Sequence, residues 1–376
     1  MGNPLVELQQ QGQSVWLDYI RRKSLLSGDI RTLIENDGLR GMTANPAIFQ
    51  VAIAAGDDYD STIEKMVRAG AEPIAIYEQL AVEDIQEACD QFRALYDSTD
   101  GGDGFVSLEV APNLAYNTEG TLEEARRLWS WVDRPNLMIK VPGTAAGVPA
   151  IETLLSEGIN VNVTLLFAIE AYEAVAWAYI RALERRVAEG KPVNRIASVA
   201  SFFVSRVDVM IDPMLDKMAA SDAGNKGKLE ALRGKAAIAN AKLAYQSFKK
   251  IFGDKRFTDL RAHGAQVQRP LWASTSVKNP AYPDLLYADS LIGPDTVDTM
   301  PRETLEAFRD HGTVANTVET DIEAEKSVLA SLAEVGIDMK AVTDQLEKEG
   351  VEKFEQAFDA LIKGIVEKRT ALLAKA

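Results

Sequence analysis

The chain has 376 residues, and 41 Lys and Arg against 56 Asp and Glu give it a formal net charge of −15 at pH 7. This acidic balance argues against binding to nucleic acid or to an anionic membrane surface, since both need a positive footprint. One cysteine and two histidines exclude an intrachain disulfide and argue against a metal site built from Cys or His. No apolar run approaches the roughly 18 residues of a membrane span. Residues 1–15 have no signal-peptide core, so we expect a cytoplasmic protein.

Short β-rich runs alternate with longer helical patterns along most of the chain. The first part predicts strands within 14–20, 38–49, 105–110, 137–141 and 159–167 and helices over 29–36, 59–69, 73–96, 121–132 and 148–157. Asp29 is the expected cap of the helix over 29–36, and Pro46 is expected to end regular structure. The second part predicts strands over 195–204, 268–276 and 296–300, helices over 169–189, 208–218 and 228–251, and a helical C-terminal segment.

Eight strands separated by helices predict an α/β fold in which a parallel sheet closes as a (β/α)₈ TIM barrel with additional helices. An open doubly wound sheet is the alternative, but the sequence contains neither the G-x-G-x-x-G nor the P-loop pattern that usually marks its nucleotide site. We expect a catalytic barrel domain over 14–314 and a C-terminal helical extension over 315–376. The sequence leaves open whether this extension covers the barrel mouth, caps its bottom or forms a dimer interface. Monomer and homodimer therefore both stay open.

Several predicted strands carry polar residues at alternate positions, although strands buried in a parallel sheet are ordinarily apolar throughout. Asn160, Asn162 and Thr164 share one face of a strand, and Ser107 and Glu109 share one face of another. An unpaired buried polar group costs roughly 1–3 kcal/mol, so stability does not explain these residues. Barrel enzymes place catalysis at the carboxyl ends of their strands. A half-exposed antiparallel sheet with polar outward residues is the alternative, and it fits one strand better than eight.

Lys140 is the strongest single candidate for catalysis. Ile139 and Val141 flank it in a predicted strand, and inside a barrel these surroundings would desolvate its amine. A desolvated amine is more easily deprotonated and attacks a ketone carbonyl to form a Schiff base. The alternative is a lysine at a strand end that extends into solvent.

Asp18 and Glu109 are carboxylates within apolar runs of two other strands, where they can donate or accept protons. For Asp18 the alternatives are a helix N-cap or an ion pair with Arg21 or Arg22. Asp18, Glu109 and Lys140 lie on three predicted strands of one barrel, and this arrangement supports all three as parts of a single site.

Arg206 follows the sixth predicted strand and is a candidate phosphate ligand, with Ser201 nearby. An isolated arginine at such a position is more often a surface residue. Asp57, Asp58 and Asp60 resemble a run of metal ligands, but at the start of a helix they fit capping better.

Motifs in these strands together resemble those of the transaldolases. They are 43–46 (TANP), 107–110 (SLEV), 139–144 (IKVPGT), 160–167 (NVNVTLLF), 201–206 (SFFVSR) and 269–280 (RPLWASTSVKNP), the last resembling the longer bacterial and plant-like branch. The resemblance spans about residues 14–312. It implies a class I aldolase barrel of the non-oxidative pentose phosphate pathway that uses no cofactor and no metal. The family moves a dihydroxyacetone unit from sedoheptulose 7-phosphate to glyceraldehyde 3-phosphate, which yields erythrose 4-phosphate and fructose 6-phosphate.

The resemblance also implies roles for single residues. Lys140 matches the Schiff-base lysine, and Asp18 matches the carboxylate that takes the hydroxyl proton during carbon–carbon cleavage. Glu109 and Thr164 match the pair that holds a catalytic water. Among the remaining matches, Asn45 and Asn162 correspond to ligands of the dihydroxyacetone hydroxyls, and Ser201 and Arg206 lie at the sugar phosphate.

The sequence departs from the family pattern at the phosphate site. Better-known members carry an arginine two residues after the serine that matches Ser274, and here that place is Ser276. We expect Lys278 to supply the second positive charge, as a point charge rather than a fork. Phe202 and Ser205 stand where the family commonly has proline and glycine.

The implied function is a transaldolase that acts through an imine on Lys140 with sugar phosphates as substrates. The nearest rival is a Schiff-base sugar-phosphate aldolase that releases free dihydroxyacetone. A second rival is a barrel that has lost catalysis and serves as an interaction module through its C-terminal helices, rich in Glu and Lys. The presence of Asp18, Glu109 and Lys140 together argues against this second rival.

Overall fold

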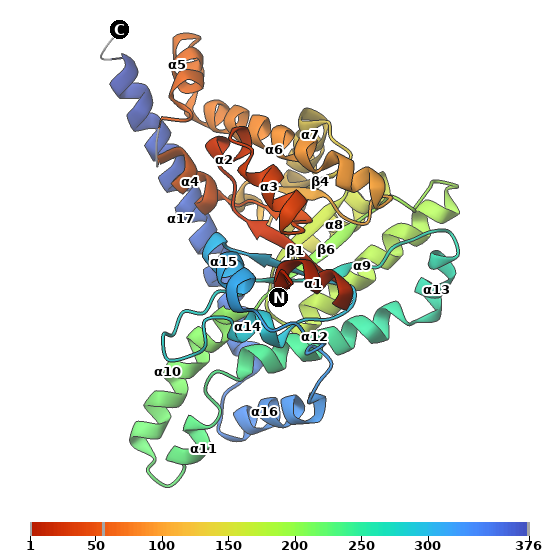
Figure 1. The fold of residues 1–376 in the computed structure, drawn as a ribbon, viewed down its shortest axis with the longest axis vertical. Helices are drawn as coiled ribbons and strands as arrows, with labels where there is room; N and C mark the ends of the chain where they lie inside the picture. The colour runs from red at the N-terminus through yellow and green to blue at the C-terminus, as the bar shows by residue number, and fades with distance from the viewer. Residues whose placement is uncertain (1, 55–56, 374–376) are drawn as a thin grey trace.

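The computed structural model describes residues 2–54 and 57–373. Within them, eight parallel strands pair in chain order, and the last pairs with the first, so that the sheet closes into a barrel (Figure 1). The TIM-barrel prediction is confirmed, and the open and antiparallel alternatives are wrong. The strands are β1 (Gln13–Asp18), β2 (Gly41–Thr43), β3 (Phe105–Glu109), β4 (Leu137–Pro142), β5 (Val161–Leu166), β6 (Ser198–Phe203), β7 (Arg269–Ala273) and β8 (Thr296–Met300).

The helices surround the barrel and cover the apolar outer face of its strands (Figure 1). Those described before β6 are α1 (Pro4–Glu7), α2 (Arg22–Leu26), α3 (Asp29–Asn36), α4 (Pro46–Ala54), α5 (Asp60–Arg68), α6 (Pro73–Ser98), α7 (Thr118–Val132), α8 (Gly147–Glu157) and α9 (Ile169–Ala188), with 3₁₀ turns η1 (Leu8–Gln11) and η2 (Pro112–Leu114). Those described after it are α10 (Ser205–Ser221), α11 (Lys226–Glu230), α12 (Ala236–Phe252), α13 (Lys255–Arg261), α14 (Leu286–Ser290), α15 (Arg302–His311), α16 (Ile322–Glu334) and α17 (Met339–Leu373).

Three local features differ from the expectations. Asp29 is the first residue of α3 rather than its cap, a position that Gly28 takes, and its carboxylate instead pairs with Arg302 at 2.6 Å. Pro46 begins α4 instead of ending regular structure, because a proline needs no N–H partner in the first turn of a helix. The helix expected over 228–251 is two helices, α11 and α12.

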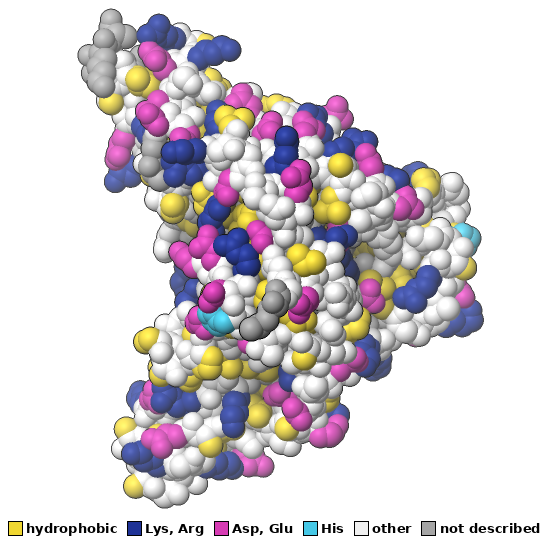
Figure 2. All heavy atoms as spheres, in the orientation of Figure 1, with side chains coloured by type: hydrophobic (Ala, Val, Ile, Leu, Met, Phe, Trp, Pro, Cys, Tyr) yellow, Lys and Arg dark blue, Asp and Glu magenta, His cyan; other side chains and the backbone are white. Residues whose placement is uncertain are grey.

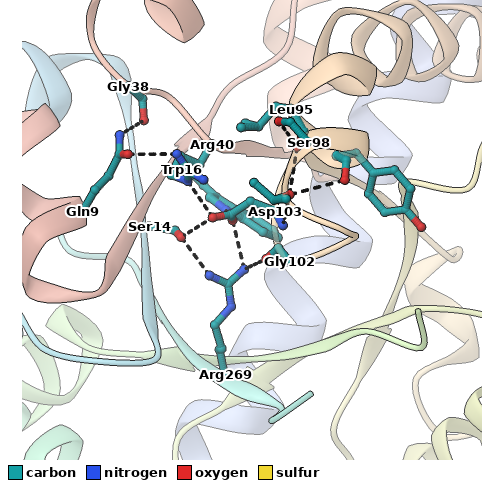
Figure 3. Close-up of polar contacts among 12 residues, drawn as sticks. Gln9, Ser14, Trp16, Gly38, Arg40, Leu95, Ser98, Gly102, Asp103 and Arg269 are labelled. Atoms are coloured by element: carbon teal, nitrogen blue, oxygen red, sulfur yellow. Dashed lines mark hydrogen bonds and ion pairs between the residues drawn. The ribbon is translucent and has the colours of Figure 1, made fainter. Parts of the chain in front are cut away.

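The amino-terminal end of the barrel is closed by an ionic cluster around Asp103 (Figure 3). The Asp103 carboxylate accepts from Arg40 Nε at 2.7 Å, from Arg269 Nη2 at 3.0 Å and from Ser14 Oγ at 2.7 Å. Burial disfavours the charged form, but Arg269 and Arg40 outweigh it and hold the pKa of Asp103 below its ordinary value. These side chains fill the bottom of the barrel, so a ligand enters from the opposite end.

The C-terminal helix α17 lies across that opposite end. It packs on α4, α6 and α10, and in Figure 1 it runs along the side of the molecule where α4 also lies. Gly350 is its point of close approach, because a Cβ there would lie 2.9 Å from Leu165 Cδ2 and 3.7 Å from Arg206 Nη1. A mid-helix glycine costs about 1 kcal/mol, and close packing explains its presence here. Of the three placements left open for the C-terminal helices, α17 takes the one over the mouth.

The other helix of the extension, α16, packs on α12 at the side of the barrel. The buried Lys242 amine of α12 lies 3.3 Å from Glu325 and donates to the Thr320 carbonyl at 3.1 Å. We retain residues 14–314 and 315–376 as a proposed division of the chain. Residues 374–376 lie outside the described part of the structure.

The surface shows acidic and basic side chains interspersed over the face seen in Figure 2. Such mixing gives this face no single-sign patch of the kind that tracks a nucleic-acid backbone. Among the described residues, no helix combines the length and apolar character that crossing a membrane requires.

Candidate active site

A cavity of about 140 Å³ lies at the carboxyl ends of the strands. Because parallel strands end at the same rim of a barrel, side chains from distant parts of the chain converge there. The cavity is lined by Asp18, Thr43, Asn45, Lys140, Thr164, Ser201, Phe203, Arg206, Ala273, Ser274, Ser276, Lys278, Thr299, Pro301 and Phe354. Most of the candidate residues therefore meet in one place.

Lys140 and Glu109 form a buried ion pair at one side of the site. They are register partners on β4 and β3, and Lys140 Nζ lies 3.2 Å from Glu109 Oε2. Lys140 is 4% exposed, so it does not extend into solvent as the alternative required. Burial raises the pKa of Glu109 to about 7 against the opposing charge of Lys140. Glu109 therefore changes protonation state near neutral pH, as a general acid–base group must.

Asp18 ends β1 and faces the same cavity. Its carboxylate accepts a hydrogen bond from Thr43 Oγ1 at 2.7 Å, and Thr43 in turn lies 2.7 Å from Thr299 Oγ1. Burial raises the pKa of Asp18, and the positive charge of Lys140 is the strongest opposing influence. The Thr43 hydroxyl stabilises one orientation of a carboxylate that is otherwise costly to keep charged.

Two ion pairs bear on the alternative interpretations of Asp18 and of the run Asp57, Asp58 and Asp60. Arg21 Nε lies 2.7 Å from Asp58, and Arg22 Nε lies 2.7 Å from Asp84, so neither arginine pairs with Asp18. Asp60 is the first residue of α5, and no side-chain hydrogen bond caps this helix. Among the described residues, no group of three or more His, Cys, Asp or Glu is placed to hold a metal ion.

The polar residues of β5 and β6 lie on the strands that follow Lys140 around the barrel, and Asn162 is its register partner. Thr164 lines the cavity, and its buried hydroxyl has no hydrogen-bond partner among the described residues. Asn162 donates to Ser107 Oγ at 3.0 Å and accepts from Ser201 Oγ at 2.7 Å. Asn162 is not among the lining residues, so here its amide positions Ser201, whereas its role as a substrate ligand stays a prediction. Asn45 lines the cavity, and its side-chain oxygen accepts from a backbone N–H in the first turn of α4.

The cavity also carries two positive charges. Arg206, in the first turn of α10, stacks over the Phe203 ring at 5.2 Å, and its buried Nη1 has no hydrogen-bond partner among the described residues. Burial lowers the pKa of Lys278, and the positive charge of Arg206 lowers it further. Ser274 has a left-handed φ of 57° and lies with its Oγ 2.9 Å from Ser205 Oγ. Lys278 Nζ donates to Ser276 Oγ. Two cations that line one cavity, of which Arg206 has an N–H without a partner among the described residues, suit a phosphate group.

A family model described as "Transaldolase/Fructose-6-phosphate aldolase" matches residues 15–365. The chain belongs to this family. A transaldolase of Trichodesmium erythraeum (strain IMS101) is 49% identical over 370 residues, which is 97% of each chain. A transaldolase of Mycolicibacterium smegmatis is 46% identical over 96% of both chains. A transaldolase of Thermobifida fusca is 46% identical over 99% of this chain and 100% of the relative.

Several residues that line the cavity were missed by the sequence analysis, among them Thr43, Thr299 and Phe354. Thr43 is the last residue of β2 and Thr299 the last but one of β8, so period-two alternation towards the carboxyl end of each strand would have found them. Phe354 had no such signal. An apolar residue in a helical pattern indicates burial but does not say against what.

Proposed function

We propose that this protein is a transaldolase that transfers a dihydroxyacetone unit from sedoheptulose 7-phosphate or fructose 6-phosphate to an aldose phosphate. The observation that carries the proposal is the buried Lys140 amine, which lines the cavity and lies 3.2 Å from Glu109. The relatives named transaldolase, aligned over nearly the whole chain, support the same reaction.

The first step joins the substrate to Lys140. The neutral amine attacks the ketose carbonyl, a carbon–nitrogen bond forms, and loss of water leaves a protonated imine. Glu109 lies close enough to the amine to move the protons of this step. Glu109 Oε1 and the Thr164 hydroxyl lack hydrogen-bond partners among the described residues, which fits a pair that holds the water produced and consumed here.

The second step breaks a carbon–carbon bond. Asp18 takes the proton of the hydroxyl next to that bond, the aldehyde leaves, and the electron pair moves into the imine to give an enamine. Asn45 and Asn162 bind the hydroxyls of the retained dihydroxyacetone unit. The enamine then attacks an incoming aldehyde, Asp18 returns the proton, and water releases the new ketose. The imine is the electron sink, so the reaction requires no metal and no cofactor.

The phosphate end of the substrate binds between Arg206 and Lys278, with Ser201 and Ser274 beside them. All four line the cavity around Lys140. Lys278 supplies the second charge that Ser276 lacks. Fixing the remote phosphate orients the reacting carbons, which is the source of much rate enhancement in such sites. These substrates are metabolites, and we place the enzyme in the cytoplasm.

Borohydride reduction in the presence of fructose 6-phosphate tests the proposal. The reagent converts an imine into a stable secondary amine, and mass mapping of the digested protein is expected to find the added dihydroxyacetone unit on Lys140. The Lys140→Ala variant serves as the control and is expected to show neither the adduct nor turnover. Unchanged turnover of this variant would place the active site elsewhere.

Omission of the acceptor aldehyde separates transfer from simple cleavage. A transaldolase consumes no more fructose 6-phosphate than there are active sites, because the dihydroxyacetone unit stays on the lysine. Full catalytic consumption without an acceptor would identify the aldolase instead.

A further inference from the structure

One cavity residue comes from the C-terminal helix rather than from the barrel rim. Phe354 of α17 is 6% exposed and lines the cavity. Its ring centroid lies 5.6 Å from Lys140 Nζ. The ring therefore stands over the atom to which the substrate becomes attached, and the helix that carries it covers the mouth (Figure 1).

Neighbouring turns of α17 hold this ring in place. One turn before it, Gly350 allows the helix to approach Leu165 and Arg206 closely. One turn after it, the Phe358 ring packs edge-on against Tyr77, with centroids 5.5 Å apart. The roof over Lys140 is thus part of a packed helix that is anchored on both sides of the ring.

The enamine formed on Lys140 has two chemical fates. In transfer, its nucleophilic carbon forms a bond to the aldehyde carbon, and the aldehyde oxygen takes a proton from Asp18. In hydrolysis, the same carbon takes a proton that originates in water. The imine thus regenerated adds a second water, which gives free dihydroxyacetone and the lysine amine. The two fates differ in whether water or an aldehyde reaches the enamine first.

We propose that Phe354 determines the specificity of this enzyme for aldehyde acceptors over water. The proposal rests on the function given above and adds the group that decides between its two outcomes. The apolar ring covers the enamine and leaves no hydrogen-bonding group on that side to hold a water against its carbon. An aldehyde fixed by its phosphate at Arg206 and Lys278 enters along the other wall of the cavity.

The ring also has an electrostatic effect, which has to be distinguished from its exclusion of water. An aromatic face close to an amine or an imine also stabilises the positive charge. Phe354→Leu removes the aromatic face but keeps an apolar roof, whereas Phe354→Ala removes both. Ile365→Ala is the control, because it removes a fully buried apolar side chain from a more distant turn of α17 but lies outside the cavity around Lys140.

The measurement is the ratio of dihydroxyacetone released to sedoheptulose 7-phosphate formed, with fructose 6-phosphate as donor and erythrose 4-phosphate as acceptor. In D₂O, dihydroxyacetone released by hydrolysis carries a carbon-bound deuterium, which identifies protonation of the enamine. We expect Phe354→Ala to raise the ratio at least about tenfold, and Phe354→Leu to stay within about threefold of the unchanged protein. Ile365→Ala is expected to keep the original ratio.

Three outcomes would overturn the assignment. An unchanged ratio in Phe354→Ala that still forms the borohydride adduct would show that the roof does not exclude water. An equal rise in Phe354→Leu would assign the effect to the aromatic face. An equal rise in Ile365→Ala would assign it to general loosening of α17. Absence of the adduct in the unchanged protein would contradict the proposed function itself, so the two failures are distinguishable.

Discussion

The amine of Lys140 lies 3.2 Å from the Glu109 carboxylate, and the two side chains are only 5% and 2% exposed. Burial of the carboxylate raises its pKa to about 7, although Lys140 favours its charged form. A base this close to the nucleophile, titrating near physiological pH, exchanges protons with it in both directions.

Substitution of Glu109 by glutamine should slow turnover by about 10²–10⁴-fold, the usual contribution of general acid–base catalysis. The free enzyme is expected to gain activity as pH rises through about 7, because the carboxylate must be deprotonated to act as a base. In Glu109→Gln this limb of the kcat/KM profile should disappear. A profile that keeps the limb would assign it to another group.

Asp18→Asn should abolish carbon–carbon cleavage but leave imine formation intact. The amide keeps the size of the side chain and its contact with Thr43, which lies 2.7 Å away, but it cannot accept the hydroxyl proton. Borohydride should therefore trap intact fructose 6-phosphate on the lysine, which is heavier than a dihydroxyacetone adduct. A dihydroxyacetone adduct at the normal rate would show that Asp18 is not the base.

The two cations that line the cavity should act on phosphorylated substrates alone. We expect Arg206→Lys and Lys278→Met each to raise KM for glyceraldehyde 3-phosphate by about 10–100-fold, in line with the loss of a charge-assisted contact. With the donor at saturating concentration, the rate with unphosphorylated glyceraldehyde as acceptor should change little, and that reaction is the internal control. Equal losses with both acceptors would indicate that the cavity has rearranged.

Asp298 gives the folded protein a pH-dependent stability. It is fully buried in β8, where Thr275 Oγ1 donates to one carboxylate oxygen at 2.9 Å and the other has no partner among the described residues. Burial raises its pKa from 3.8 to about 7. Its contribution is therefore complete below pH 3.8 and is lost as the pH rises through about 7. Asp298 should add roughly 2–3 kcal/mol to the fall in urea-unfolding free energy between pH 5 and 8, so the fall in Asp298→Asn should be smaller by this amount. Identical pH dependence of the two proteins would contradict this.

The cluster at the bottom of the barrel should stabilise the fold without touching catalysis. Asp103→Ala leaves the partly buried Arg40 and Arg269 without their carboxylate partner, which costs about 3–5 kcal/mol of unfolding free energy. Because the pKa of Asp103 is lowered, its contribution is present above pH 3.8 and is lost as pH falls through the folded-state value. The exposed pair of Asp90 with Arg134 is the control, and Asp90→Ala should cost no more than about 1 kcal/mol. Equal costs would contradict the assignment.

The sequence by itself determined the barrel and the chemical centre of the site. A strand repeats every two residues, so alternation alone shows that Lys140 and Thr164 point away from their aliphatic neighbours. A parallel barrel brings all carboxyl strand ends to one rim, so Asp18 had to lie near Lys140 once eight strands were counted. Helix limits were less certain, as Pro46 illustrates, because a proline that interrupts a strand also suits the first turn of a helix.

Only the tertiary structure decided which residues complete the site and close the barrel. Asp103 reads as part of a turn, and its two arginines lie far from it in the chain, so their pairing exists only once the strands have closed. Phe354 reads as one apolar position among many in a long helix. Local sequence reports that such a residue is buried, but its partner depends on where the whole helix docks. Contacts between distant segments arise from packing of the complete chain, and no local period encodes them.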